Sequence, residues 1–259
     1  MVTQTLNVCI KASVLVALFS LGLGSLSIEM TKAQSESISA KIAKIEFIPP
    51  KGAGVPKSPT TAGGTRPIDC HKVNSCLIPL VPAAIDKLEY YPLTVAERPT
   101  FYISLPKTSG TAIFTLYQHL PSEIKKVHRF SFPVKTSGGI IAIALPESSP
   151  ALQNGSTYEW TLSLNSDSAR GLVRRVQLEP NFMQKLNQAK PSEKLAIYAA
   201  AGIWYDSIGA LAELKNAQPY DQVFLAEWSD FLKSMNIDKD IVMQEFTPCC
   251  QAANYSASR

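Results

Sequence analysis

Apolar and polar residues alternate with a period of two between about residues 79 and 178. The clearest segment is Thr157–Leu164, in which Tyr158, Trp160, Leu162 and Leu164 alternate with polar residues. Such alternation is typical of strands with one buried face. The same reasoning predicts further strands at 100–105, 111–118, 127–133 and 172–178, and the continuous apolar run at 140–145 predicts a central buried strand. No long helical pattern intervenes, so we predict an antiparallel, immunoglobulin-like β-sandwich at 78–179, followed by helices in an α+β protein.

Turn residues punctuate this segment. Gly and Asn favour the backbone conformations that reverse the chain. The sequence therefore predicts turns at Ser109-Gly110, Ser137-Gly138-Gly139, Asn154-Gly155 and Arg170-Gly171.

The apolar period lengthens after Pro180, which predicts helices over residues 180–236. A short helix is expected at 181–190, and Pro191 suits the first turn of the next one. Gly202 is expected to end that helix, and Pro219 to stop its successor. A third apolar stripe follows at Val223, Leu225, Trp228, Phe231 and Leu232. Residues 237–259 are predicted to form a flexible tail.

Part of this helical region resembles a single tetratricopeptide repeat. The matching positions are Tyr198, Gly202, Trp204, Ser207, Leu211, Leu214 and Pro219. Repeat arrays need about three copies to be stable alone. We therefore expect this hairpin to pack on the sandwich, with Tyr198, Trp204 and Leu211 in the core. Trp228 and Phe231 of the third helix are then the candidate surface for a protein partner.

The N-terminus predicts export. Lys11 precedes an apolar run at 12–26, and small residues follow, which is the order of a secretory signal. Cleavage is expected after Ala33, with Ser27 as the alternative, and an uncleaved anchor is the other interpretation. We predict a signal peptide at 1–33 and a periplasmic or extracellular protein with no stable membrane span after cleavage.

Residues 34–77 are rich in Pro, Gly and Ser and are predicted to be a linker, extended or disordered. Residues 41–48 could pair weakly as an edge strand. Within the linker, Gly63-Gly64-Thr65-Arg66 offers backbone N–H groups and a guanidinium to an anion. A flexible hinge is the alternative, so Arg66 is a candidate anion contact only.

Four cysteines remain after export, namely Cys70, Cys76, Cys249 and Cys250. An oxidising compartment permits disulfides, and four cysteines allow three pairings. We favour Cys70 with Cys76, which closes a short loop. A zinc site at these two cysteines and His71 lacks a fourth ligand, so no metal is predicted.

Composition and motifs argue against several functions. The net charge is only +4, without the clustered Lys and Arg typical of nucleic-acid binding. No G-x-S-x-G motif occurs, and nothing in the sequence pairs the acidic residues Glu159, Asp206, Glu213 and Glu227. Trp204-Tyr205-Asp206 could form a sugar platform, although core packing and helix capping also explain it. We predict no catalytic residue and no cofactor.

A longer resemblance spans roughly residues 60–235. It consists of Gly63-Gly64-Thr65-Arg66 before Cys70, the run at 138–146, Leu152 and Gly155 before Tyr158-Glu159-Trp160, and the stretch from Tyr198 to Leu214. In this order the residues resemble the domain of unknown function 928 family, an exported cyanobacterial family. The resemblance implies export and a β-rich part with a helical tail, and it supplies no catalytic residue.

The sequence thus favours an exported, non-enzymatic module of the cell envelope that binds a protein or has a structural role. The alternative is a carbohydrate-binding sandwich that uses exposed Tyr90, Tyr91 and Tyr102. A hydrolase with an unrecognised site is the third hypothesis. The expected partner is accordingly another envelope protein or a glycan, with no nucleic acid.

Overall fold

A computed structural model describes residues 45–50, 76–82, 91–217, 219–234, 237, 239–247 and 256–257. The chain divides into two compact units, Met1–Ile38 and Ser39–Arg259. All described residues belong to the second unit. The predicted signal peptide and both cleavage sites lie outside the described residues.

The larger sheet carries most of the predicted strands. Its strands are β2 (Leu93–Thr94), β4 (Thr108–His119), β5 (Ile124–Thr136), β7 (Thr157–Leu164), β8 (Asp167–Arg175) and β9 (Ser256–Ala257). They lie in the order β2-β8-β7-β4-β5-β9, and only β2 and β8 pair in parallel. Long antiparallel strands with one apolar face need a second layer to cover that face.

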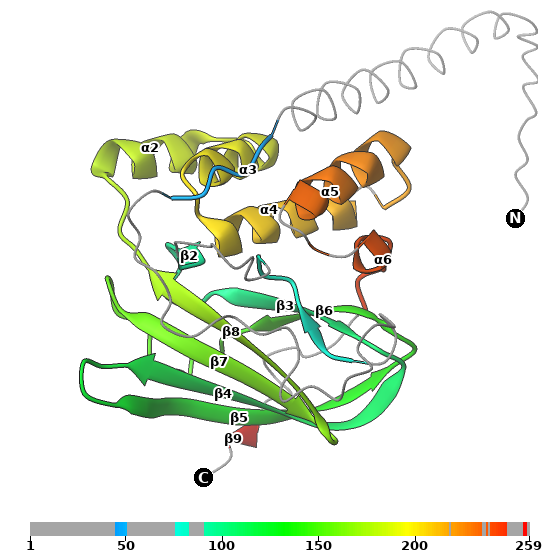
Figure 1. Ribbon diagram of the computed structural model, residues 1–259. Helices are drawn as coiled ribbons and strands as arrows, with labels where there is room; N and C mark the ends of the chain where they lie inside the picture. Colours follow the sequence, from blue (N-terminus) through cyan, green and yellow to red (C-terminus); the bar gives the residue numbers. More distant parts are fainter. Residues whose placement is uncertain are drawn as a thin grey trace, which may run out of the picture. The chain divides into compact units, whose positions relative to one another are not determined.

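A smaller sheet supplies that layer. It contains β1 (Ile78–Pro79), β3 (Thr100–Leu105) and β6 (Gly139–Ala144) in the order β1-β3-β6 (Figure 1). The Phe101 ring of β3 lies 5.1 Å from the Phe114 ring of β4 and 5.2 Å from the Trp160 ring of β7. The predicted mixed α+β, sandwich-like architecture is therefore confirmed.

Strand β3 departs from the expected pattern of one buried and one polar face. Phe101, Ile103 and Leu105 are fully buried between the sheets, as predicted. Tyr102 and Ser104 point to the opposite face, yet they are only 8% and 0% exposed. Helix α4 (Trp204–Ala217) packs on β2 and β3, so the outer face of β3 belongs to a second core.

Two of the predicted turns are wrong. Ser109-Gly110 and Arg170-Gly171 lie within β4 and β8. Gly171 is required there for packing, since a Cβ on it would lie 2.7 Å from the Trp160 ring. Asn154-Gly155 does form a turn, with a positive φ of 74° at the glycine. It leads into β7 and does not join a hairpin.

Helices follow the strands, as predicted. They are α2 (Pro180–Gln188), α3 (Pro191–Ala200), α4, α5 (Gln222–Ser234) and α6 (Lys239–Val242). Gly202 has a φ of 69° in the α3–α4 turn, a conformation that glycine adopts without strain. A Cβ there would lie 2.8 Å from the Ile48 carbonyl oxygen, so the glycine also admits a neighbouring segment.

That segment is residues 45–50, which the sequence assigned to the linker. Phe47 is only 4% exposed, and its ring lies 5.2 Å from the Trp204 ring. The Ile48 backbone N–H donates to the Ala199 carbonyl at 3.0 Å. These residues form no strand, so the predicted edge strand is wrong over its described part. The buried Phe47 ring and the backbone hydrogen bond of Ile48 anchor this segment to the helices.

The described residues after 236 also depart from the predicted flexible tail. Ile237 and Ile241 are buried. The Ile140 N–H donates to the Glu245 carbonyl, and the Thr247 N–H donates to the Ile140 carbonyl, both at 2.8 Å. Strand β9 pairs with β5. The C-terminal segment therefore contributes to the fold at both sheets.

Candidate functional site

Trp228 and Phe231 are not an exposed partner surface, as the sequence had suggested. They are 0% and 5% exposed. The Phe231 ring stacks on the Trp204 ring at 5.8 Å, and the Trp228 ring meets the Phe246 ring at 5.6 Å. Residues 45–50 and the C-terminal segment cover this stripe, so it is core.

The other candidates from the linker are only partly described. Arg66 and Cys70 lie outside the described residues. Cys76 is buried and disulfide-bonded, but no other cysteine of the chain is described. The pairing of Cys70 with Cys76 therefore stays a prediction. Within the described residues, no group of three or more His, Cys, Asp or Glu is placed to hold a metal ion.

A cleft of about 270 Å³ opens where the segment from β2 to β3 meets helices α3 and α4. We call it the Tyr102 cleft. Its walls are Thr94, Ala96, Arg98, Pro99, Thr100 and Tyr102 on the strand side, and Lys194, Tyr198, Tyr205, Asp206, Gly209, Ala210 and Glu213 on the helix side.

Helix α4 is fixed beside the cleft by buried aromatic hydrogen bonds. The Tyr205 hydroxyl donates to the Leu172 carbonyl at 2.7 Å and accepts from the Trp160 indole N–H at 2.9 Å. The Trp204 indole N–H donates to the Leu80 carbonyl at 3.1 Å. Trp204 and Tyr205 are therefore structural, which confirms core packing over a sugar platform.

Asp206 joins the two walls of the cleft. Its Oδ2 accepts a hydrogen bond from the Thr94 hydroxyl at 2.8 Å and another from the Val95 N–H at 3.1 Å. Burial raises the pKa of this carboxyl to about 6, although these donors oppose the shift. Part of its surface stays open to the cleft, so the side chain is half-buried. Asp206 is thus more than the helix cap expected from sequence.

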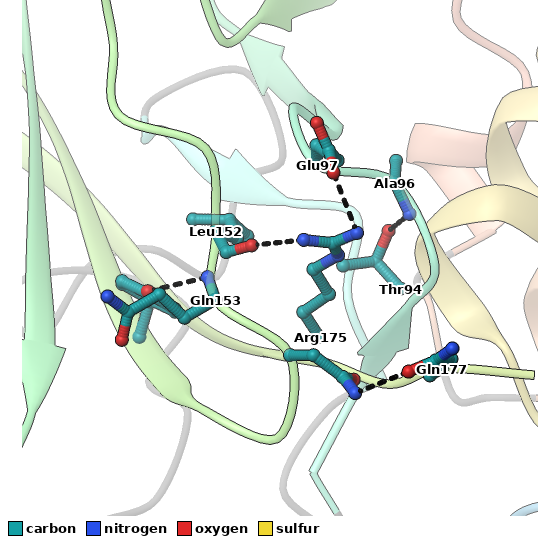
Figure 2. Close-up of polar contacts among 9 residues, drawn as sticks. Thr94, Ala96, Glu97, Leu152, Gln153, Arg175 and Gln177 are labelled. Atoms are coloured by element: carbon teal, nitrogen blue, oxygen red, sulfur yellow. Dashed lines mark hydrogen bonds and ion pairs between the residues drawn. The ribbon is translucent and has the colours of Figure 1, made fainter.

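A polar network holds the strand wall in place (Figure 2). The Thr94 hydroxyl accepts from the Ala96 N–H at 3.1 Å. Arg175 donates to the Leu152 carbonyl at 2.6 Å and forms an ion pair with Glu97 at 3.0 Å. The segment between β2 and β3 is therefore tied to β8 on one side and to Asp206 on the other.

Two tyrosines and one carboxylate of the cleft form no side-chain hydrogen bond or ion pair with a described residue. They are Tyr102, Tyr198 and Glu213. Tyr102 is only 8% exposed, yet its hydroxyl forms no hydrogen bond to a described group. Burial and then the Glu213 charge raise its pKa to about 12. Burial, followed by Asp206 and Glu213, also raises the pKa of Tyr198.

The sequence missed this grouping. Asp206 and Glu213 are seven residues apart on α4, which places both on one helix face. Tyr198 and Lys194 share a face of α3 in the same way. Glu159 instead lies beside His119, 3.3 Å away, and the Glu227 side chain lies outside the description. Tyr198, expected in the core, is half-buried at the cleft.

The tyrosines of the alternative carbohydrate hypothesis fall in different places. Tyr90 lies outside the described residues, and Tyr91 is half-buried with the Arg174 guanidinium 5.9 Å from its ring centre. Tyr102 is buried, but it lines the cleft. Of the two that the structure describes, Tyr102 is therefore the one that lies at the candidate site.

The sheets and helices that form the cleft lie within one family match. A family model described as Domain of Unknown Function (DUF928) matches residues 61–246. This chain belongs to the DUF928 family. The DUF928 match contains every residue of the Tyr102 cleft. No curated protein and no solved structure matches the chain.

None of the helices within the described residues is long and apolar enough to span a membrane.

Proposed function

We propose that this DUF928 protein is an exported, non-enzymatic binding module of the cell envelope that holds a saccharide unit in the Tyr102 cleft. The observation that carries the proposal is the buried Tyr102 side chain, whose hydroxyl has no partner among the described residues and lines an open cleft. The hydroxyl opens onto the cleft and is not enclosed by protein, so it can hydrogen-bond to a group that enters from the solvent side. A hydroxylated ligand would satisfy it.

The chemistry of the remaining wall supports the same ligand class. Tyr198 offers an aromatic face with a polar tip, and such faces suit the apolar side of a sugar ring. Asp206 and Glu213 accept hydrogen bonds from sugar hydroxyls. The volume of about 270 Å³ is small for a ligand site, so the cleft suits one sugar unit.

Export and envelope location are supported by the apolar run at 12–26 and by the disulfide at Cys76. The α3–α4 pair, joined through Gly202, supports a hairpin of tetratricopeptide type, and the facing sheets support an immunoglobulin-like sandwich. Both are finer proposals than the α+β architecture. In this proposal the hairpin forms one wall of a ligand cleft and does not itself offer a groove to a protein.

The test is saccharide binding by the purified mature protein, first on a glycan array and then by calorimetry. Tyr198→Ala and Glu213→Gln should each weaken binding about tenfold, which is the loss of about 1.4 kcal/mol. Tyr220→Ala is the matched control, because Tyr220 is 86% exposed and lies outside the cleft. If saccharides bind equally well to all variants, the cleft is not their site.

A hydrolase is the second candidate, favoured by the raised pKa of Asp206 beside Glu213. Glycosidases use one protonated and one ionised carboxyl group across the scissile bond. Release of reducing sugar from a glycan panel by the wild type, lost in both Asp206→Asn and Glu213→Gln, would establish this candidate. A panel that binds but is never cleaved would favour the binding module.

A further inference from the structure

Two carboxylates of the Tyr102 cleft, the half-buried Asp206 and the exposed Glu213, act on its tyrosines Tyr102 and Tyr198. Burial is the main cause of the raised pKa of both Tyr102 and Tyr198. The charge of Glu213 raises the pKa of Tyr102 further, and the charges of Asp206 and Glu213 raise that of Tyr198 further. Burial and these carboxylate charges therefore both disfavour ionisation of the two hydroxyls.

The two cations that line the cleft, Arg98 and Lys194, equal these carboxylates in number, but among the described residues no ion pair joins them. The Arg98 Nη2 donates to the carbonyls of Glu147 at 3.4 Å and Ser149 at 3.2 Å, so the guanidinium is held by another loop. Lys194 is half-buried on α3, and within the described residues no ion pair joins it to Asp206 or Glu213. A cationic ligand would give Glu213 the ion-pair partner that neither side chain supplies.

We infer that the Tyr102 cleft recognises an ammonium group, carried by an amino sugar, through Glu213, Asp206 and the tyrosines Tyr102 and Tyr198. This deepens the proposed function and rests on it. An ammonium group has three donors and no acceptor, which matches carboxylate and phenol oxygens. It is also attracted to the faces of aromatic rings within about 6 Å. A neutral sugar of the same shape would gain neither contribution.

The same geometry makes recognition dependent on pH. The groups that face Asp206 are Thr94 and Val95 as donors, Tyr198 and Lys194 on α3, Glu213 on α4, and Arg98 and Tyr102 on the strand side. Asp206 carries its charge above a pKa of about 6 and loses it below. Acidification removes one of the two carboxylate charges, so ammonium binding should weaken while binding of a neutral sugar should not.

The experiment compares three probes by calorimetry on the mature protein at about pH 7, where Asp206 is charged, and at about pH 5, where it is mostly protonated. The probes are glucosamine, glucose and N-acetylglucosamine. We expect glucosamine to bind about tenfold more tightly than the other two at the higher pH. Glu213→Gln should abolish this preference, and Tyr220→Ala should keep it. At the lower pH the preference should shrink several-fold.

Each outcome separates this inference from the proposed function. Equal affinity for the three sugars would overturn the ammonium inference and leave saccharide binding standing. Binding of tetramethylammonium with no binding of any sugar would support the ammonium site and overturn the saccharide function. Absence of binding by every probe would overturn both. If the glucosamine preference persists in Glu213→Gln while that variant remains folded by circular dichroism, the assignment of the site is wrong.

Discussion

Two tyrosines on opposite walls of the same cleft are buried to a similar extent and have opposite hydrogen-bonding states. Tyr205 is 4% exposed, and its hydroxyl makes two hydrogen bonds, to Leu172 and Trp160. Tyr102 is 8% exposed, and its hydroxyl makes none to a described residue. Buried polar groups are nearly always satisfied within the fold. Burial alone therefore does not distinguish the structural Tyr205 from Tyr102, the tyrosine that we propose to bind a ligand, whereas their hydrogen bonds differ.

The largest expected effect comes from removing the indole that supports Tyr205. Trp160 is fully buried, and its ring packs against Phe101 and Phe114. Trp160→Ala should lower the free energy of unfolding by about 3–5 kcal/mol, because it creates a large cavity and removes the N–H that donates to the Tyr205 hydroxyl. Chemical denaturation measures this loss. Tyr220→Ala is the control and should stay within about 0.5 kcal/mol of the wild type.

Tyr205→Phe isolates the hydrogen bonds from the packing. The variant keeps the ring but leaves the Leu172 carbonyl and the Trp160 N–H without their partner. We expect a loss of about 1–3 kcal/mol in the free energy of unfolding. Denaturation in urea is the measurement. A change below about 0.5 kcal/mol would contradict the structural role of this hydroxyl.

Asp206→Asn tests the link between the cleft walls. The pKa of the folded carboxyl is about 6, above its ordinary value of 3.8, so the folded state binds the proton more tightly. Stability is therefore lost as the pH rises from about 4 through 6. The amide oxygen of the variant can still accept from Thr94 and Val95.

At about pH 7 the neutral amide of Asp206→Asn avoids the cost of a buried charge, and the variant should be more stable by about 1 kcal/mol after the lost helix-dipole interaction is subtracted. At about pH 4 the two proteins should be equally stable. Thermal unfolding at both pH values gives the comparison. A variant that is less stable at the higher pH would show that the ionised carboxylate is a net stabilising contact.

Gly209→Ala should produce a small gain in stability. A Cβ at this position would lie 3.9 Å from the Tyr102 hydroxyl, which is ordinary contact. Alanine is favoured over glycine inside a helix, so the variant should gain about 0.5–1 kcal/mol in stability. The added methyl group narrows the cleft and should weaken ligand binding. Unfolding and calorimetry together separate the two effects, and a destabilised variant would contradict the open space at Gly209.

The strands were readable from sequence because one face of each is buried. Thr100–Leu105 and Thr157–Leu164 have the predicted bounds, since apolar alternation reports burial directly. Gly171 was read as a turn residue, but it lies in β8 because the Trp160 ring needs the space of a missing side chain. The local sequence pattern around a glycine does not reveal which distant side chain fills the space beside it.

The sequence did not reveal which residues cover the helices, and it did not reveal the cleft. The stripe with Trp228 and Phe231 indicates a buried face, but not that Phe47 and the residues after 236 bury it. The cleft joins Tyr102 to Tyr198 and Glu213, about a hundred residues apart in the chain. The spacing of Asp206 and Glu213 on one helix face was the one sequence feature that pointed to the cleft. It indicates a site only once the structure places Tyr102 beside these carboxyl groups.

The most direct test of the contrast between the two tyrosines is one paired measurement on Tyr102→Phe and Tyr205→Phe. Each variant is unfolded in urea and titrated with glucosamine under the same conditions. We predict that Tyr102→Phe keeps the wild-type free energy of unfolding within about 0.5 kcal/mol and loses several-fold in affinity. Tyr205→Phe should lose stability and keep most of its affinity while folded. If Tyr102→Phe is destabilised like Tyr205→Phe and binds the ligand as the wild type does, Tyr102 is a structural residue and the cleft is not a binding site.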